Sequence, residues 1–216
     1  QKLLDNISFI PPEKLSKKVI TPSITFDNTS RGILEVLQHK EVVLHIGFIA
    51  YQFYHTNKSL QNKDLLQRMN AIEKVKKYES LIDEMKSDGL YREQLCREAD
   101  ILMLHKRLAN DLLPKDANVE AGNYRIHDIE IVGVDVKFPA PELVPAAMAK
   151  FIENSNSRVE KVWSGNKEEF IMVAAEVSYN FVRIHPFPDF NGRMSRLLLA
   201  MTLRAFGVPF NLALRG

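Results

Sequence analysis

Residues 185–196 read His185-Pro-Phe-Pro-Asp189-Phe-Asn191-Gly192-Arg193-Met-Ser-Arg196 and join two segments of helical periodicity. Apolar residues recur every three or four positions from about 167 to 184, and again from about 192 to 206. The first of these helices is expected to end near His185, because a residue that precedes proline is pushed out of the helical conformation. The stretch therefore predicts a loop between two packed helices that leads directly into a helix N-terminus.

The residue types in this loop are those that handle a phosphate. A helix N-terminus presents free backbone N–H groups and the positive end of a dipole, and Gly192 lets the backbone approach an anion closely. Arg193 and Arg196 lie three positions apart, so they project to the same side and match phosphate oxygens. Asp189 offers a hard oxygen ligand for Mg²⁺, and His185 can accept a proton near neutral pH. Together these residues predict transfer chemistry on a phosphate of a nucleotide.

The rest of the chain predicts a mainly α domain with one small β-hairpin. Residues 42–54 indicate a buried helix, residues 64–113 indicate two helices that break at Asp88-Gly89, and residues 142–154 indicate another helix. The β-branched and aromatic residues of 121–141 are typical of a short hairpin.

Composition excludes several classes of protein. The 216 residues correspond to one domain or a domain with an appendage, and a formal net charge of +2 argues against a bulk nucleic-acid binder. Val42–Tyr54 is too short to span a membrane, which takes about 20 residues. The single cysteine, Cys96, excludes an internal disulfide and favours a reducing compartment, so we expect a cytoplasmic location for this fragment. Because the chain starts at Gln1, we interpret it as a processed or cloned fragment.

Residues 185–196 resemble the signature of the Fic (Fic/DOC) family, H-P-F-x-[D/E]-G-N-G-R-x-x-R. The one departure is Phe190, where the family has glycine. Ala121-Gly-Asn-Tyr-Arg125 followed by the expected hairpin resembles the A-G-x-[FY]-R element and flap of Fic proteins, and Leu104-His-Lys106 resembles the helix before it. The resemblance implies a Fic-type helical bundle with a small β-hairpin flap. We expect an N-terminal part, 1–64, and a Fic core, 65–216.

Fic proteins mostly transfer AMP from ATP to a Ser, Thr or Tyr hydroxyl of a target protein and release pyrophosphate. By resemblance, His185 is the general base and Asp189 holds Mg²⁺. The positions that the resemblance assigns to nucleotide binding are Asn191, Gly192, Arg193 and Arg196. ATP and a target protein with an acceptor hydroxyl are the expected partners, and a homodimer is compatible with the sequence.

Two further elements are expected from the resemblance. The flap would hold the target segment by strand addition. Its expected contact positions are Ile131, Val132, Gly133 and Val134. The segment Ser23–Asn28 resembles an inhibitory motif, [S/T]-x-x-x-E-[G/N], with Asp27 in place of the glutamate that pairs with the second arginine of the signature, here Arg196. The alternative is that Asp27 or Asn28 merely caps a following helix.

Other functions stay open at this point. The same site could remove AMP from a modified protein or transfer another nucleotide-derived phosphate group. A reading from a different class is a weakly active module for nucleotide sensing or protein interaction, disabled at Phe190. Glycine reaches backbone angles there that phenylalanine reaches only at a cost in energy.

Overall fold

The computed structural model describes residues 30–68, 72–113, 120–130, 136–165 and 169–208. Within these ranges the regular elements are all helices. They are α3 (Ser30–Arg68), α4 (Ile72–Ser87), α5 (Glu98–Ala109), the short 3₁₀ helix η2 (Pro141–Leu143), α6 (Val144–Ser164), α7 (Phe170–Ile184) and α8 (Asn191–Ala205). The mainly α fold class is therefore confirmed.

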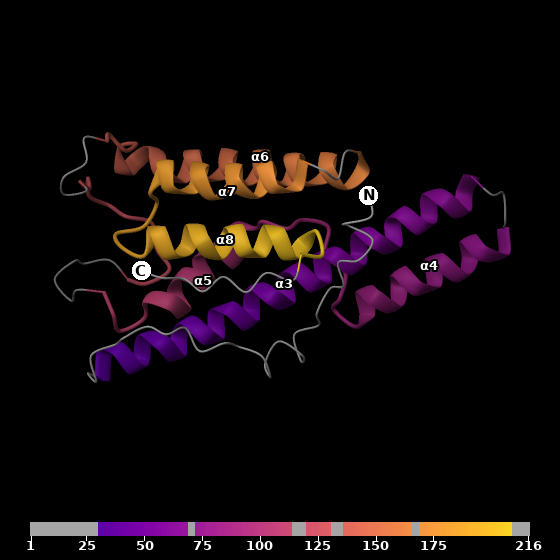
Figure 1. The fold of residues 1–216 in the computed structure, drawn as a ribbon, viewed down its shortest axis with the longest axis horizontal. Coiled ribbons are helices and arrows are strands. Elements are labelled where there is room, and N and C mark those ends of the chain that lie inside the picture. The colour runs from indigo at the N-terminus through magenta and orange to yellow at the C-terminus, as the bar shows by residue number, and fades with distance from the viewer. Residues whose placement is uncertain (1–29, 69–71, 114–119, 131–135, 166–168, 209–216) are drawn as a thin grey trace.

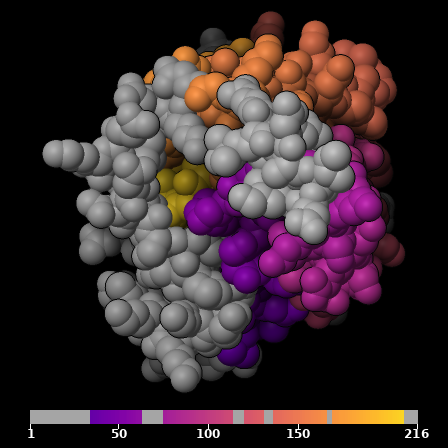
Figure 2. All heavy atoms as spheres, turned by 90° about the vertical axis from the view of Figure 1, so that its right-hand side faces the viewer, coloured from indigo at the N-terminus to yellow at the C-terminus, as the bar shows by residue number. Residues whose placement is uncertain are grey.

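The helices stack around α8. Figure 1 shows α8 between α7 and the long diagonal helix α3, with α6 beside α7 on the far side. The shorter α5 packs against α3. Figure 2 views the molecule from the α4 end, where α4 lies beside α3 while α6 and α7 lie above them. This arrangement puts the loop between α7 and α8 at the same end of the bundle as the start of α3 (Figure 1).

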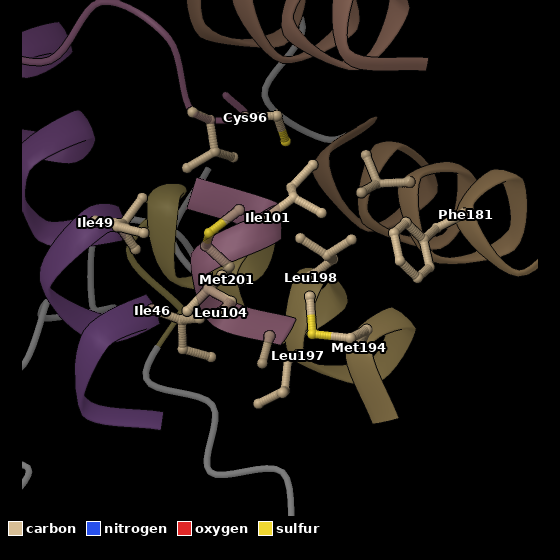
Figure 3. Packing of buried hydrophobic residues seen from close by; sticks show 14 of the residues in the cluster. Ile46, Ile49, Cys96, Ile101, Leu104, Phe181, Met194, Leu197, Leu198 and Met201 are labelled. Carbon is tan, nitrogen blue, oxygen red and sulfur yellow. The ribbon is translucent and has the colours of Figure 1, made fainter. Parts of the chain in front are cut away.

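The core lies where α3, α5, α7 and α8 meet. Figure 3 shows side chains from all four helices pointing toward one another. Those labelled there are Ile46, Ile49, Ile101, Leu104, Phe181, Met194, Leu197, Leu198 and Met201, together with Cys96 from the segment before α5. Burying side chains of this size contributes about 1.5–3 kcal/mol each. The inner face of α8, the helix that follows the loop 185–190, is thus buried in the core.

Two helices are longer than the sequence indicates. The expected buried helix 42–54 is the middle of α3, which runs on because Ser30–Arg68 holds no proline. The expected helix 142–154 continues to Ser164. Asn156 stabilises this extension, because its side-chain amide donates to the Cys96 carbonyl at 2.7 Å and its oxygen accepts from the Cys96 N–H at 2.9 Å. That long-range contact outweighs the weak helix propensity of the polar residues around it.

The hairpin prediction is not matched in the part that the structure describes. Residues 121–130 and 136–140 form turns and irregular backbone without a strand, and the carbonyls of His127 and Pro139 accept from the Arg125 side chain. Residues 131–135, the centre of the expected hairpin, lie outside the described residues. The expected boundary at residue 64 falls inside α3. No described helix combines the length and apolar character needed to cross a membrane.

Candidate functional site

His185 caps α7 in a conformation that leaves one imidazole nitrogen free to act. Its backbone is left-handed, with φ 52° and ψ 59°, and its N–H bonds to the Phe181 carbonyl at 3.0 Å. The ring nitrogen Nδ1 lies 3.2 Å from the Val182 carbonyl, which can only accept, so Nδ1 carries the hydrogen and Nε2 the lone pair. Burial lowers the pKa of His185, partly opposed by the Val182 carbonyl, and this keeps the ring neutral near pH 7. A strained, neutral histidine on a helix end fits a general base.

Arg125 ties the backbone of this histidine to the preceding segment. The guanidinium is buried, and its Nε donates to the His185 carbonyl at 2.8 Å. Its two terminal nitrogens donate to the carbonyls of His127 and Pro139. The Arg125 N–H also donates to the Pro186 carbonyl at 2.9 Å. One residue thus fixes the backbone of His185, the segments on both sides of residues 131–135 and the start of the loop.

The loop between α7 and α8 is closed on itself by Asn191. The Asn191 side chain accepts from the Phe187 N–H at 2.9 Å and donates to the Phe187 carbonyl at 2.7 Å. Both of its polar groups are therefore used inside the loop, and the residue is buried. These bonds shape the loop, and the phosphate-binding role that the resemblance implies for Asn191 stays a prediction.

Phe190 takes the left-handed conformation that the missing glycine would favour. Its φ is 63° and its ψ is 6°, and it immediately precedes α8. The ring is buried, with the Arg193 guanidinium 4.5 Å above its centroid. The loop therefore keeps a glycine-type backbone path with a phenylalanine, at a cost that ring packing offsets.

His105 of α5 supports the same loop from beneath. Its ring stacks on Phe187 with centroids 3.7 Å apart, Nε2 faces the Asp189 carbonyl at 3.3 Å, and Nδ1 accepts from the Gly122 N–H at 2.9 Å. Because Nδ1 must accept, the ring has to be neutral, and burial lowers the pKa of His105 to about 4. This histidine connects the Ala121–Arg125 element to the loop.

The N-terminus of α8 presents unpaired donors. Its first intrahelical bond runs from the Met194 N–H to the Phe190 carbonyl, so the N–H groups of residues 191–193 precede the hydrogen-bond ladder. A Cβ added to Gly192 would meet only a terminal nitrogen of Arg196, at 3.6 Å. Glycine thus leaves space directly in front of the helix end, where an anion is favoured.

Arg193 and Arg196, in the first half of α8, face α3. Arg193 forms an ion pair with Glu35, and both side chains are partly buried. Arg196 has a buried Nε without a hydrogen-bond partner among the described residues. Burial and then Arg193 lower the pKa of Arg196, and burial followed by the charges of both arginines lowers the pKa of His39 on α3. The two arginines thus form a positive site in which Arg193 is paired with the Glu35 carboxylate and the Nε of Arg196 has no partner among the described residues.

The donor set fits a nucleotide with a divalent cation. The orphaned Nε of Arg196 and the free N–H groups of the helix end suit an anion. Asp189 is exposed, and one of its carboxylate oxygens accepts from the Phe190 N–H at 2.5 Å. Mg²⁺ takes one or two protein carboxylates and completes its shell with phosphates and water. Among the described residues, no three His, Cys, Asp or Glu side chains are grouped as metal ligands.

The structure thus brings together His185, Asp189, Gly192, Arg193 and Arg196 at one end of the bundle. The flap positions Ile131, Val132, Gly133 and Val134 and the inhibitory candidates Ser23, Asp27 and Asn28 lie outside the described residues. Four residues around the loop had no assigned role from sequence: Glu35, His39, His105 and Arg125. Of these, Arg125 and His105 fall in segments that resemble family elements, whereas nothing local marks Glu35.

The comparisons with known proteins agree with this geometry. The sequence profile described as "Fic/DOC family" matches residues 95–203, just over half of the chain. The chain belongs to the Fic/DOC family. A Fic domain-containing signaling protein of Bacteroides thetaiotaomicron shares the fold, with a TM-score of 0.53 and 16% identity over 95% of this chain and 60% of that chain.

Curated relatives carry adenylyltransferase names. "Protein adenylyltransferase Fic" of Drosophila mojavensis is 34% identical over 110 residues, which are 51% of this chain and 20% of that protein. A "probable protein adenylyltransferase" of Aquifex aeolicus is 32% identical over 57% of this chain and 34% of that protein. A Fido domain-containing protein of Dictyostelium discoideum is 36% identical over 43% of this chain and 60% of that protein. The chain thus matches 60% or less of the length of each of these Fic relatives.

Proposed function

We propose that this Fic chain transfers AMP from ATP to a hydroxyl side chain of a target protein and releases pyrophosphate. The observation that carries the proposal is the neutral His185, oriented by Val182 and Arg125, beside a helix N-terminus that holds two arginines. The adenylyltransferase names of the relatives support the same reaction.

His185 acts on the acceptor hydroxyl. Its Nε2 takes the proton while the hydroxyl oxygen forms a bond to the α-phosphorus, and the bond from that phosphorus to the bridging oxygen of pyrophosphate breaks. The hydrogen bond from Nδ1 to the Val182 carbonyl stabilises the ring as it becomes charged. The His185 carbonyl, held by Arg125, keeps the ring aligned for in-line attack.

The start of α8 binds the phosphates. The N–H groups of residues 191–193 face the developing negative charge, and the guanidinium of Arg196 has a free donor for an outer phosphate oxygen. Arg193 can contribute once Glu35 releases it. Asp189 would hold Mg²⁺, which when bound neutralises phosphate charge. Asn191 shapes the loop through its two bonds to the Phe187 backbone, and its role in nucleotide binding stays a prediction.

Labelled ATP tests the reaction directly. The chain is incubated with Mg²⁺ and a cell lysate, with ATP labelled at the α or the γ phosphate. We expect protein-bound label from the α position alone, and its loss in His185→Ala. His127→Ala is the matched control, because that histidine is exposed and its side chain lies outside the loop. Label from the γ position alone indicates kinase-type transfer, and full activity of His185→Ala contradicts the base assignment.

Inhibition by the segment Ser23–Asn28 stays a prediction. A Glu or Asp that reaches Arg196 would compete with an outer phosphate for the same guanidinium. Asp27→Gly is expected to raise transfer of the α label onto the chain itself, and an unchanged rate would contradict the inhibitory role.

A further inference from the structure

A hollow of about 510 Å³ lies on the face of the bundle opposite α3, between α6 and α7. The two helices run side by side there (Figure 1). Its floor contains the buried side chains of Phe151, Val173 and Val177, and its end toward the loop is closed by Phe138 and Ile184. We name it the α6–α7 groove. It contains none of the phosphate-binding groups of α8.

The groove has a positive rim. Lys137, Lys150 and Arg183 line it, all three are exposed, and none has a carboxylate partner among the described residues. The acidic residue in the lining is Glu176, whose carboxylate accepts from Arg158 at 2.9 Å. An occupant with negative charge therefore meets three free cations and a carboxylate that is already paired.

The groove leads to the base. Ile184 at its end is followed directly by His185, and the Phe138 ring lies 4.4 Å from the imidazole centroid. From Val173 to Ile184 the helix rises about 16 Å, which is the length of about five extended residues. A short polypeptide segment in the groove thus places its next residues beside His185.

The lining fits a polypeptide. Apolar side chains can enter the floor, and the amides of Asn154 and Asn180, on opposite walls, can bond to a peptide backbone. We propose that the α6–α7 groove holds an acidic segment of the target protein next to the hydroxyl that is modified. This inference rests on the proposed transfer to a protein. It states that the target is selected by the acidic charge of a segment, in addition to any backbone pairing with the flap.

Peptide selection tests the groove without catalysis. The chain is immobilised without nucleotide and exposed to 12-residue peptides with a central Thr and random flanking positions. We expect the retained peptides to be enriched in Asp and Glu on one side of the Thr, together with apolar residues. Retention should weaken between 0.05 and 0.5 M NaCl, because exposed charges are screened.

The decisive comparison uses two charge reversals on α6. Lys150→Glu changes the rim, whereas Lys161→Glu makes the same change at an exposed position of the same helix outside the groove. Lys150→Glu is expected to weaken the best acidic peptide about tenfold and to abolish the acidic enrichment. Lys161→Glu should leave both within twofold. Random selection, or equal effects of the two variants, overturns the proposal.

Labelled ATP separates this proposal from the proposed function. Transfer of the α label with random peptide selection overturns the groove and leaves the reaction standing. Acidic selection that depends on Lys150, without transfer of label by either the natural chain or Asp27→Gly, supports the groove and contradicts the reaction.

Discussion

Phe190 affects stability in two opposing ways, through the strain of its left-handed backbone and through the packing of its ring. The variant Phe190→Gly measures the balance between them. The left-handed backbone of phenylalanine costs about 1–2 kcal/mol relative to glycine. Glycine, however, loses about 0.5–1 kcal/mol through the greater freedom of the unfolded chain. The ring is 5% exposed and lies beneath the Arg193 guanidinium, so removing it costs about 3–5 kcal/mol. The loss of packing prevails, and Phe190→Gly should be about 3 kcal/mol less stable.

Denaturation with urea, followed by the fluorescence of Trp163, provides the measurement. This single tryptophan is buried in the core, so it reports global unfolding. For a chain of this size the change lowers the Tm by about 6–12 °C. Phe190→Ala is the matched control, because it loses the ring and keeps the left-handed strain.

Two outcomes would refute the reasoning. If Phe190→Gly is more stable than the natural chain, ring packing contributes less than the strain. If Phe190→Ala is more stable than Phe190→Gly, the strain of the left-handed backbone is smaller than the loss that glycine brings through the unfolded chain. We expect the glycine variant to be the more stable of the two by about 0.5–1 kcal/mol.

Three more predictions concern contacts around the loop. Glu35→Gln should tighten ATP binding about fivefold by titration calorimetry, because it frees Arg193 from an ion pair worth about 1 kcal/mol; unchanged affinity would show that the pair does not compete. The pKa of His105 falls from 6.5 to about 4 on folding, so its contribution is present above pH 6.5 and is lost as the pH falls toward 4. Between pH 6.5 and pH 4 the free energy of unfolding, measured with urea, should fall by about 3 kcal/mol more for the natural chain than for His105→Asn. Parallel pH profiles of the two proteins would contradict this prediction. Arg125→Lys should lower kcat about tenfold with ATP affinity within twofold, because lysine has one nitrogen where the guanidinium reaches three carbonyls with three, and the His185 backbone loosens; an effect on affinity alone would assign Arg125 to nucleotide binding.

Local sequence was sufficient for the elements whose signals are local. The apolar spacing on both sides of residues 185–196 predicts α7 and α8 to within a few residues, and the break at Asp88-Gly89 appears as the end of α4 at Ser87. Gly89 has φ 67°, the conformation that ends a helix most readily with glycine.

The end of α6 could not be predicted in this way. Asn154 and Ser155 suggest a helix terminus, yet the helix continues because Asn156 bonds the backbone of Cys96, 60 positions away. The hairpin prediction relied on β-branched residues, whose strand preference depends on a partner strand and a face to bury. Its centre, 131–135, lies outside the described residues, and at its described edge the Pro139 carbonyl accepts from Arg125.

The sequence by itself determined which ionisable side chains the loop carries, namely His185, Asp189, Arg193 and Arg196, and that a helix begins beside them. Only the tertiary structure decided how they are held. Arg125 lies 60 positions from His185, and His105 lies 84 positions from Asp189. Glu35, near the start of α3, meets Arg193 because α8 packs on α3. The periodicity and spacing of the sequence do not predict such pairs. They form where the buried faces of helices that are distant in sequence pack together, because this packing brings polar residues at the edges of those faces into contact.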